Sequence, residues 1–188
     1  MKIEQFSVEN KGYLPQIREL YQNGLDGMIR FYSPDVHDRV IDMRDDDFFD
    51  GLIERDGLYL AVNDGRLEGV LECGDMQYRK TKMGLIAWVL ASNKGNGVGT
   101  SLINHYIDDC KGEKDMVVLM VHRKNKAYQL YKKLGFVDCG EVNGLCKMTY
   151  WISERGRKRT IKTVLKREEK RLTKDFLIDW TGVIDSLE

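Results

Sequence analysis

Residues 94–99 read KGNGVG, and they stand between an apolar run at 85–90 and a segment whose apolar residues keep a helical spacing from 102 to 107. A second stretch, residues 125–136, reads NKAYQLYKKLGF and follows another apolar run at 116–121. A strand that leads through a glycine turn into a helix directs several backbone N–H groups toward one point. Such a turn binds phosphate oxygens without a dedicated cation. These two stretches together decide the fold that the sequence predicts.

Taken alone, the glycine turn fits several kinds of protein. It lacks the G-K-[ST] ending of a nucleotide P-loop, because Lys94 precedes the glycines. It also lacks the full dinucleotide fingerprint, because the residue three after Gly97 is Thr100. An ordinary strand-to-helix connector is one alternative, and a nucleotide-binding protein that uses the same turn is another.

Taken with the second stretch, the turn resembles the acetyl-CoA loop of the GNAT family, the GCN5-related N-acetyltransferases. That loop reads [Arg/Gln]-x-x-Gly-x-[Gly/Ala], and Lys94 stands here in its first place. The family's following motif, roughly Asn-x-x-Ala-x-x-x-Tyr-x-x-x-Gly-Phe, is matched by Ala127, Tyr131, Gly135 and Phe136. Asn125 stands one residue closer to the alanine than in that motif. The resemblance is specific over residues 58–151 and ends at about residue 152.

The resemblance implies an α/β (α+β) fold with a mixed, mostly antiparallel sheet of six to seven strands flanked by four helices. The apolar patterns predict the same order of elements. Asn63-Asp64-Gly65 predicts a hairpin turn, and Gly135 predicts the end of the last helix of the domain. The predicted strands are 2–8, 58–63, 66–74, 82–91, 116–121, 136–139 and 145–151, and the predicted helices are 13–25, 36–53, 97–109 and 124–134.

The resemblance also implies a site for acetyl-CoA as the co-substrate, without a metal. The loop residues expected to hold it are Lys94, Gly95, Asn96, Gly97, Val98, Gly99 and Thr100. Val89 and Leu90 are expected to offer backbone N–H groups to the thioester carbonyl. Asn125 has two alternative roles: it binds pantetheine or a catalytic water, or it caps the helix that begins there.

Tyr131 is the residue that the resemblance implies as the acid that protonates the departing CoA thiolate. The alternative is an aromatic residue of the core, since its spacing is helical. The general base must be a carboxylate or imidazole near the acetyl group. Residues 82–91 contain no acid, so Glu72 on the preceding strand is the predicted base. Glu68, His122 and a chain of water molecules are the alternatives.

Composition limits the classes of protein that fit the chain. Lys+Arg and Asp+Glu each number 30, so the net charge is zero and gives no bulk attraction to nucleic acid or to a membrane. The four cysteines contain no C-x-x-C pair, which indicates free buried thiols in a reducing compartment. No signal peptide begins the sequence and no apolar run approaches membrane length. We therefore expect a cytoplasmic protein of one main domain, residues 1–151.

Residues 152–188 differ in character and are predicted to form a C-terminal extension. Ten Lys and Arg residues but only two Glu residues fall in 155–174, where apolar residues keep a helical spacing, so a basic amphipathic helix is expected. Residues 176–187 are strongly apolar and should pack on the domain, or on a second copy in a homodimer. The basic helix has two alternative partners, which are nucleic acid and the acidic residues of 35–56. Those acidic residues are either a rim that attracts a cationic amine or a solvated helix face.

Two functions of different classes follow from these features. The leading hypothesis is an N-acetyltransferase that moves an acetyl group from acetyl-CoA to a primary amine, small molecule or peptide, by direct attack. The alternative is a non-catalytic acyl-CoA-binding or regulatory module on the same fold, with a basic tail that contacts nucleic acid or the ribosome. Small amines, antibiotics, protein N-termini and lysine side chains all fit as acceptors.

Overall fold

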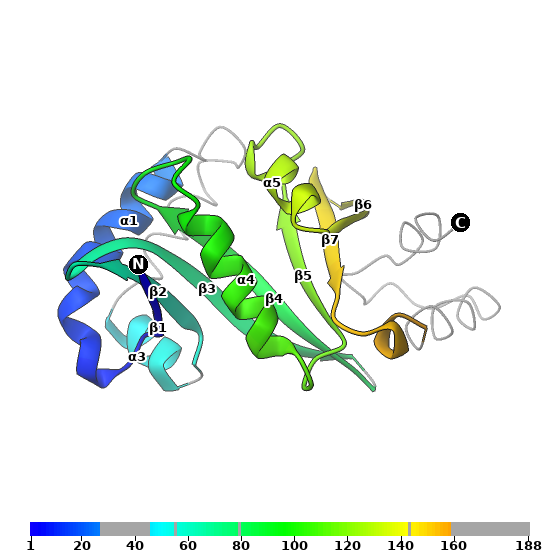
Figure 1. Cartoon of the computed structure of the whole chain (residues 1–188), viewed down its shortest axis with the longest axis horizontal. Helices are drawn as coiled ribbons and strands as arrows, with labels where there is room; N and C mark the ends of the chain where they lie inside the picture. Colours follow the sequence, from blue (N-terminus) through cyan, green and yellow to red (C-terminus); the bar gives the residue numbers. More distant parts are fainter. Residues whose placement is uncertain (27–45, 55, 79, 143, 159–188) are drawn as a thin grey trace. The chain divides into compact units, whose positions relative to one another are not determined.

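The computed structural model describes residues 1–26, 46–54, 56–78, 80–142 and 144–158. Its strands form one mixed seven-stranded sheet in the order β1-β2-β3-β4-β5-β7-β6, which confirms the predicted α+β fold (Figure 1). The elements along the chain are β1 (Lys2–Gln5), the 3-10 helix η1 (Val8–Tyr13), α1 (Leu14–Asp26), α3 (Asp46–Glu54), β2 (Leu58–Asn63), β3 (Arg66–Tyr78), β4 (Thr81–Ala91), α4 (Val98–Cys110), β5 (Met116–Val121), α5 (Ala127–Lys133), β6 (Val137–Val142) and β7 (Leu145–Trp151).

The chain divides into two compact units. The first consists of Met1–Gly74 and Ile86–Tyr106, and the second of Asp75–Leu85 and Ile107–Glu188. The first unit therefore contains the glycine turn and the first turns of α4. The second contains β5, α5, β6 and β7.

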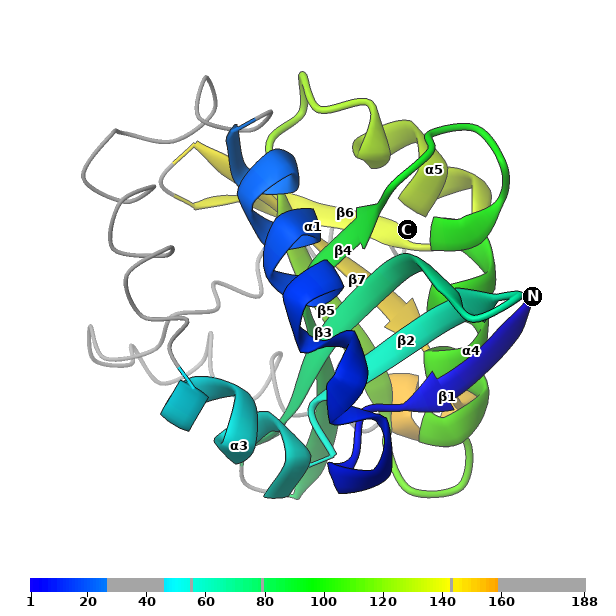
Figure 2. The ribbon, with the colours of Figure 1, turned by 90° about the vertical axis from the view of Figure 1, so that its left-hand side faces the viewer.

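Helices cover both faces of the sheet in the first unit. Successive residues of a strand point to opposite faces, and β2 illustrates this alternation. Leu58 and Leu60 belong to the core cluster under α1 and α3, whereas the ring of Tyr59 lies 5.8 Å from that of Tyr106 on α4. Figure 2 shows α1 and α4 on either side of β2 and β3.

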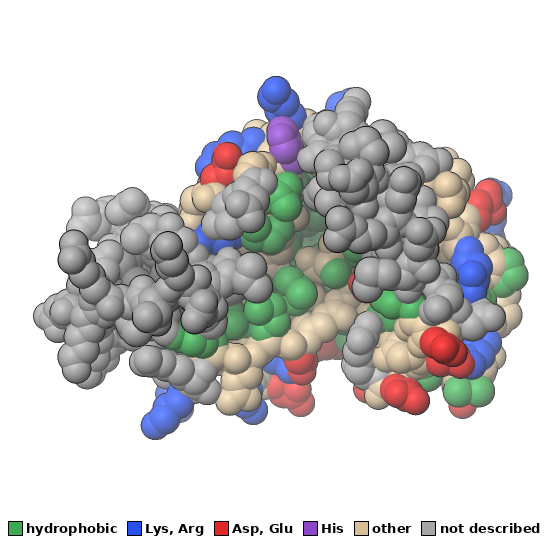
Figure 3. All heavy atoms as spheres, turned by 180° about the vertical axis from the view of Figure 1, so that it is seen from behind, with side chains coloured by type: hydrophobic (Ala, Val, Ile, Leu, Met, Phe, Trp, Pro, Cys, Tyr) green, Lys and Arg blue, Asp and Glu red, His purple; other side chains and the backbone are tan. Residues whose placement is uncertain are grey.

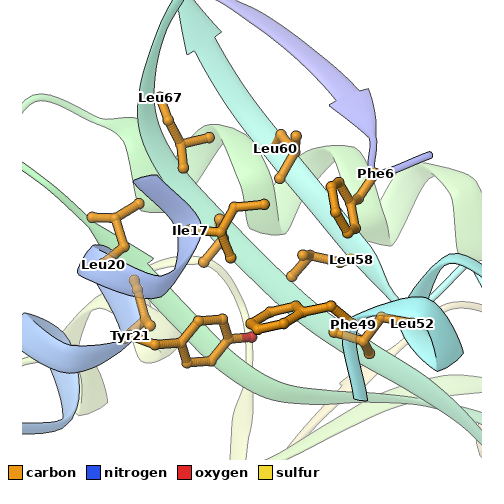
Figure 4. Close-up of a cluster of buried hydrophobic side chains, with 11 residues drawn as sticks. Phe6, Ile17, Leu20, Tyr21, Phe49, Leu52, Leu58, Leu60 and Leu67 are labelled. Carbon is orange, nitrogen blue, oxygen red and sulfur yellow. The ribbon is translucent and has the colours of Figure 1, made fainter. Parts of the chain in front are cut away.

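The main core of the first unit joins these strands to α1 and α3 (Figure 4). Burying one large apolar side chain stabilises a fold by about 1.5–3 kcal/mol, so this cluster fixes α1 and α3 on the sheet. Tyr21 and Phe49 meet edge to face within it, with ring centroids 6.0 Å apart. The fully or largely buried members are Phe6, Ile17, Leu20, Tyr21, Phe49, Leu52, Leu58, Leu60, Leu67, Val70 and Leu90.

The hairpin between β2 and β3 turns where the sequence predicts it. Asp64 and Gly65 both have positive φ, 49° and 76°, as a two-residue type I′ turn requires. The pairing continues to Val62↔Leu67 and then shifts to Ala61↔Gly69. Glu68 is therefore the extra residue of a β-bulge, which turns its side chain out of the regular alternation.

In the second unit, β7 pairs antiparallel with both β5 and β6. Helix α5 ends at Gly135, which has φ 94° and terminates the helix as predicted. Behind it, the ring of Phe136 lies 5.7 Å from that of Tyr131 and 5.5 Å from that of Tyr150. These aromatic contacts attach α5 to β7.

Several predicted boundaries differ from the structure. The first strand ends at Gln5, not at residue 8, and the chain then enters η1. Strand β3 continues to Tyr78, four residues beyond its predicted end, and α5 begins at Ala127 instead of residue 124. Of the helix predicted at 36–53, residues 36–45 lie outside the described residues, and α3 accounts for the remainder.

The four cysteines are free and buried, which confirms that prediction: Cys73, Cys110, Cys139 and Cys146. Among the residues that the structure describes, no helix has both the length and the apolar character needed to cross a membrane.

Candidate functional site

The glycine turn has the backbone geometry that anion binding requires. Gly95 and Gly97 have φ of 98° and 79°, values that L-residues rarely adopt, and the space where their Cβ atoms would stand is open to 4 Å. The N–H of Ser101 donates to the carbonyl of Gly97 at 2.9 Å, the first bond of α4. The N–H groups of Val98, Gly99 and Thr100 therefore precede the hydrogen-bond ladder of the helix, as the first N–H groups of any helix do. Residues 92–97 are exposed, whereas Val98 is buried and Gly99 and Thr100 are half-buried at the start of α4.

Gly69 on β3 brings the start of α4 close to the sheet. A Cβ on this glycine would stand 2.7 Å from Cγ1 of Val98 and 2.8 Å from the carbonyl oxygen of Leu90. Both distances are shorter than van der Waals contact. Only glycine therefore lets the first turn of α4 sit at its observed depth, directly after the glycine turn. Gly69 is not among the predicted site residues, although an isolated glycine inside a strand is a signal of such a close approach.

Gly69→Ala is expected to destabilise the fold by about 1–3 kcal/mol, the usual effect of forcing a methyl group into a packed site. The reason is that a backbone carbonyl, unlike a flexible side-chain end, cannot move away from the new Cβ. Urea unfolding of the two proteins measures the difference. Gly74→Ala on the same strand is the matched control, since nothing lies within 4 Å of a Cβ there. Equal losses in both variants would contradict the proposed role of Gly69.

Hydrogen bonds tie the loop to the bulge on β3. The N–H of Ser92 donates to the carbonyl of Glu68 at 2.9 Å, and the Ser92 hydroxyl donates to the Glu68 carboxylate at 3.0 Å. Two neighbouring side chains at the end of the preceding strand pack in different places. Leu90 joins the core under α1, whereas Cγ1 of Val89 lies 3.5 Å from where a Cβ on Gly99 would stand. The side chains of Val89 and Leu90 thus pack against other residues, so only the backbone N–H groups of these two residues serve the expected role of donating to the thioester carbonyl.

Glu72 is a buried carboxylate with a defined partner. It is 8% exposed, and the hydroxyl of Tyr21 donates to its Oε2 at 2.6 Å. Its register partner is Leu58, so it extends the face of β3 that packs against α1. Of the alternative bases, Glu68 is engaged by Ser92, and Nδ1 of His122 accepts from the N–H of Lys124 at 3.1 Å. Tyr21, which is not among the predicted site residues, is separated from Glu72 by 51 positions.

Asn125 stabilises the turn that leads into α5. Its Oδ1 accepts from the N–H of Ala127 at 3.0 Å, and its backbone carbonyl accepts from Tyr128 at 3.0 Å. These bonds form a turn ahead of α5, whose N-cap is Lys126 without a side-chain capping bond. Both predicted roles of Asn125, capping the helix and binding pantetheine or a catalytic water, stay predictions.

Tyr131 lies on α5 and is 8% exposed. Its ring packs edge to face on Phe136. A buried ring with a fixed orientation is what a positioned proton donor needs, but a core aromatic residue has the same features. Its role as the acid therefore stays a prediction.

A polar network centred on Asp138 holds α5 to β6. The Asp138 carboxylate accepts from the Tyr128 hydroxyl at 2.8 Å and pairs with the Arg123 guanidinium at 2.6 Å. Burial raises the pKa of Asp138, but the hydrogen bonds from Cys146, Tyr128 and the Gly140 N–H, with the charge of Arg123, outweigh burial and hold that pKa below its usual range. Burial, together with the Asp138 carboxylate, raises the pKa of Cys146 to about 12, so this thiol stays protonated.

Asp138→Asn is expected to lower the stability at neutral pH by about 1–3 kcal/mol, since it removes a charged acceptor from a hydrogen-bonded network. The pKa of this carboxyl is lower in the folded protein than in the unfolded chain. Its stabilising contribution is therefore present above the ordinary pKa of about 4 and is lost as the pH falls through the folded value. Urea unfolding at pH 7 and at pH 3 should show the difference between wild type and variant shrinking at the lower pH. A difference that is constant with pH would contradict this account.

The acidic surface predicted at 35–56 is described in part. Asp47, Asp50 and Glu54 are exposed on α3, and Asp50 pairs with Lys11 at 2.6 Å. The acidic residues at 35–45 lie outside the described residues. An exposed ion pair contributes only about 0–1 kcal/mol, so the acids of α3 stay available for other cations.

The predicted site residues fall into two groups. Glu72, Val89, Leu90 and the loop 94–100 belong to the first unit, on β3, on β4 and at the start of α4. Asn125 and Tyr131 belong to the second unit.

Comparison with known proteins agrees with this architecture. Residues 44–148 match the family model of the acetyltransferase (GNAT) domain. A search of curated proteins by sequence returned no match.

Solved structures with the same fold include several acetyltransferases. The PaiA N-acetyltransferase of Thermoplasma acidophilum in complex with coenzyme A is 17% identical, with a TM-score of 0.66 over 80% of this chain and 98% of that one. A ribosomal-protein-alanine N-acetyltransferase of Brucella melitensis is 19% identical, with a TM-score of 0.60 over 80% and 99%. An aminoglycoside 6'-acetyltransferase of type Ii is also 19% identical, with a TM-score of 0.58 over 82% and 99%.

Proposed function

The chain belongs to the GNAT acetyltransferase family, and we propose that it is an N-acetyltransferase that transfers the acetyl group of acetyl-CoA to a primary amine. The observation that carries the proposal is the exposed glycine turn at the start of α4. Two glycines with positive φ lead there into the first N–H groups of a helix, and the space where the Cβ atoms of these glycines would stand is open.

The turn would hold the phosphates of CoA through its backbone. Helix N-termini carry a partial positive charge, and their unpaired N–H groups donate to phosphate oxygens. Lys94 is exposed at the beginning of the turn and would add a full positive charge. The main-chain donors of Gly95 to Thr100 would set the position of the phosphates, and Lys94 would raise the affinity.

The reaction needs one nucleophile and two proton transfers. The neutral amine attacks the thioester carbonyl carbon, a C–N bond forms, and the C–S bond breaks with its electron pair on sulfur. Backbone N–H groups at Val89 and Leu90 would stabilise the negative charge that develops on the carbonyl oxygen. Tyr131 would give its proton to the departing thiolate, and the proton lost from the amine would pass to a base.

Glu72 is the base that fits best among the three candidates. Glu68 accepts from Ser92 and His122 accepts within a turn, whereas Glu72 is buried in the first unit, where the Tyr21 hydroxyl donates to its Oε2 at 2.6 Å. Tyr21 would orient this carboxylate for the proton transfer.

A cationic amine is the acceptor class that the charge favours. Asp47, Asp50 and Glu54 put negative charge on α3, and such charge raises the local concentration of a cationic substrate. The acetyltransferases of the same fold named above are named for different substrates, which include aminoglycosides and ribosomal-protein alanine. Their low identity leaves the individual amine open.

The proposal is tested with acetyl-CoA and a panel of amines, read by the release of free thiol. The panel contains polyamines, aminoglycosides, peptides with a free N-terminus and peptides with a lysine. Turnover of at least one amine above the rate of hydrolysis supports an enzyme. Tight CoA binding by calorimetry with no turnover on the panel would favour the second candidate, a non-catalytic acyl-CoA-binding module.

A further inference from the structure

The strands of the second unit present two different faces. On one face Leu119 is paired with Met148, and Val117 with Tyr150, whose ring contacts that of Phe136 at a tilt, with centroids 5.5 Å apart. Val117 and Met148 are fully buried there. Helix α5 therefore belongs to the layer over this face.

The opposite face carries a second apolar cluster, and every member of it lies on a strand. Met116, Met83 and Cys139 are its buried centre. Met120, next but one to Val118 on β5, extends the same face and is 38% exposed. We call the following residues the methionine face: Met76, Tyr78, Met83, Met116, Val118, Met120, Val137, Cys139 and Trp151.

The methionine face lacks a covering layer among the described residues. A sheet face that is apolar is stable when another layer of structure buries it. No described helix contributes a residue to this cluster, and six of its nine residues are only partly buried or exposed. Hydrophobic side chains are visible in the view of the molecule from behind (Figure 3).

The chain leaves the sheet at the edge of this face. Trp151 is a member of the methionine face and pairs with Met116 at the start of β5. The N–H of Ile152 then donates to the carbonyl of Asp115 at 3.1 Å. Gly156 follows so closely that a Cβ there would stand 2.8 Å from the Cβ of Asp115. Residues 152–158 are thus fixed beside the beginning of β5, and the remainder of the chain starts from that point.

We propose that residues 176–187 of the same chain are the layer that covers the methionine face. This segment is the most apolar part of the chain beyond β7, and its polar residues fall between positions that keep a helical spacing. Its apolar members are Phe176, Leu177, Ile178, Trp180, Val183, Ile184 and Leu187.

The segment is long enough to reach the face. Seventeen residues, 159–175, separate it from the last described residue, Lys158. They span about 25 Å as a helix and up to about 55 Å when extended. The five strands β3-β4-β5-β7-β6, at about 4.8 Å spacing, are only about 19 Å wide, so either conformation allows the apolar segment to lie across them. Burial of the apolar side chains attaches residues 176–187 to the face, and the basic segment 155–174 is the stretch of chain that connects them to the sheet.

The methionines allow this contact to be read in the full-length protein. The indole ring of Trp180 shifts the resonances of methyl groups beside it, so ¹³C-methyl-methionine NMR of wild type and Trp180→Ala locates the ring. The signals of Met76, Met116 or Met120 are expected to move by more than a line width. Met148 lies on the opposite face and is the internal control, whose unchanged signal also reports an intact fold.

A second full-length variant covers the case in which Trp180 points away from the sheet. Ile184→Asp places a charge in the proposed contact and is expected to move the same signals and to lower the melting temperature. Ser186→Asp adds the same charge at a polar position and should change neither. Methionine-face signals that stay fixed in both Trp180→Ala and Ile184→Asp would overturn the proposal. Signals that change on dilution, together with a dimer in sedimentation, would overturn it in favour of a second copy of the chain.

Discussion

Tyr131→Phe is expected to lower turnover by about 10²-fold and to leave the affinity for acetyl-CoA almost unchanged. Phenylalanine keeps the ring that packs edge to face on Phe136, so the fold of α5 is retained. It removes the phenolic hydroxyl and with it the proton donor, and a general acid typically contributes 10²- to 10⁴-fold to the rate. A fall in kcat and in kcat/KM by the same factor is the signature of an interaction made in the transition state alone. The measurement is steady-state thiol release under conditions in which the chemical step limits the rate.

Tyr128→Phe is the matched control, because Tyr128 lies one turn earlier on the same helix and is equally buried. Its hydroxyl donates to Asp138, so its loss should reduce the stability and leave kcat nearly unchanged. Equal turnover of Tyr131→Phe and wild type would make Tyr131 a structural residue. A similar fall in both variants would point to a disturbed helix instead of a lost acid.

Local sequence signals predicted most of the fold. The hairpin at Asp64 and Gly65 needs two residues that accept positive φ, and few dipeptides meet that need. Strands β5 and β7 have the predicted bounds, since each is a run of apolar or β-branched residues between clear turn signals. The two motifs around the glycine turn and Tyr131 then specified which α+β fold contains these elements.

The boundaries that differ are decided by contacts that a local pattern does not contain. Helix α5 begins late because the side chains of His122 and Asn125 bond to nearby backbone N–H groups and form turns ahead of it. Strand β1 ends early because the Asn10 side chain caps η1, accepting from the Ser7 N–H at 2.8 Å. Strand β3 runs past Gly74 because Met76 and Tyr78 pack into the methionine face of the second unit.

The candidate site was predictable where its chemistry is carried by the backbone. A glycine turn at a helix N-terminus can be recognised in the sequence because glycine adopts positive φ without steric cost. The partner of Glu72 was not predictable, since Tyr21 lies 51 residues away and reaches it only through the packing of α1 on β3. Gly69 matters for the same reason: the close approach of Val98 exists only in the folded chain.

A substitution in the glycine turn can distinguish an effect on CoA affinity from an effect on the stability of the fold. Gly97 is the residue whose carbonyl accepts the first hydrogen bond of α4, so it stands at the N-cap of that helix. Aspartate is among the best N-cap residues, and its negative charge is favourable near a helix N-terminus. It also tolerates positive φ better than most residues, and the space beside Gly97 is open.

Gly97→Asp is therefore expected to lose only about 1–2 kcal/mol of stability to the positive φ, and to weaken CoA binding by roughly 10- to 100-fold. The cause is that the new carboxylate would lie where a phosphate binds and would repel it. Two like charges about 4 Å apart repel by about 1 kcal/mol in bulk water and by about 4 kcal/mol near a protein surface. Calorimetry with CoA measures the affinity, and urea unfolding measures the stability. Gly97→Asn separates the charge from the bulk of the side chain, and Gly12→Asp applies the same change of net charge at an exposed, open position away from the turn. If the affinity falls as far in Gly12→Asp as in Gly97→Asp, the effect is one of net charge. If it falls in neither, the phosphates of CoA bind elsewhere than at the start of α4.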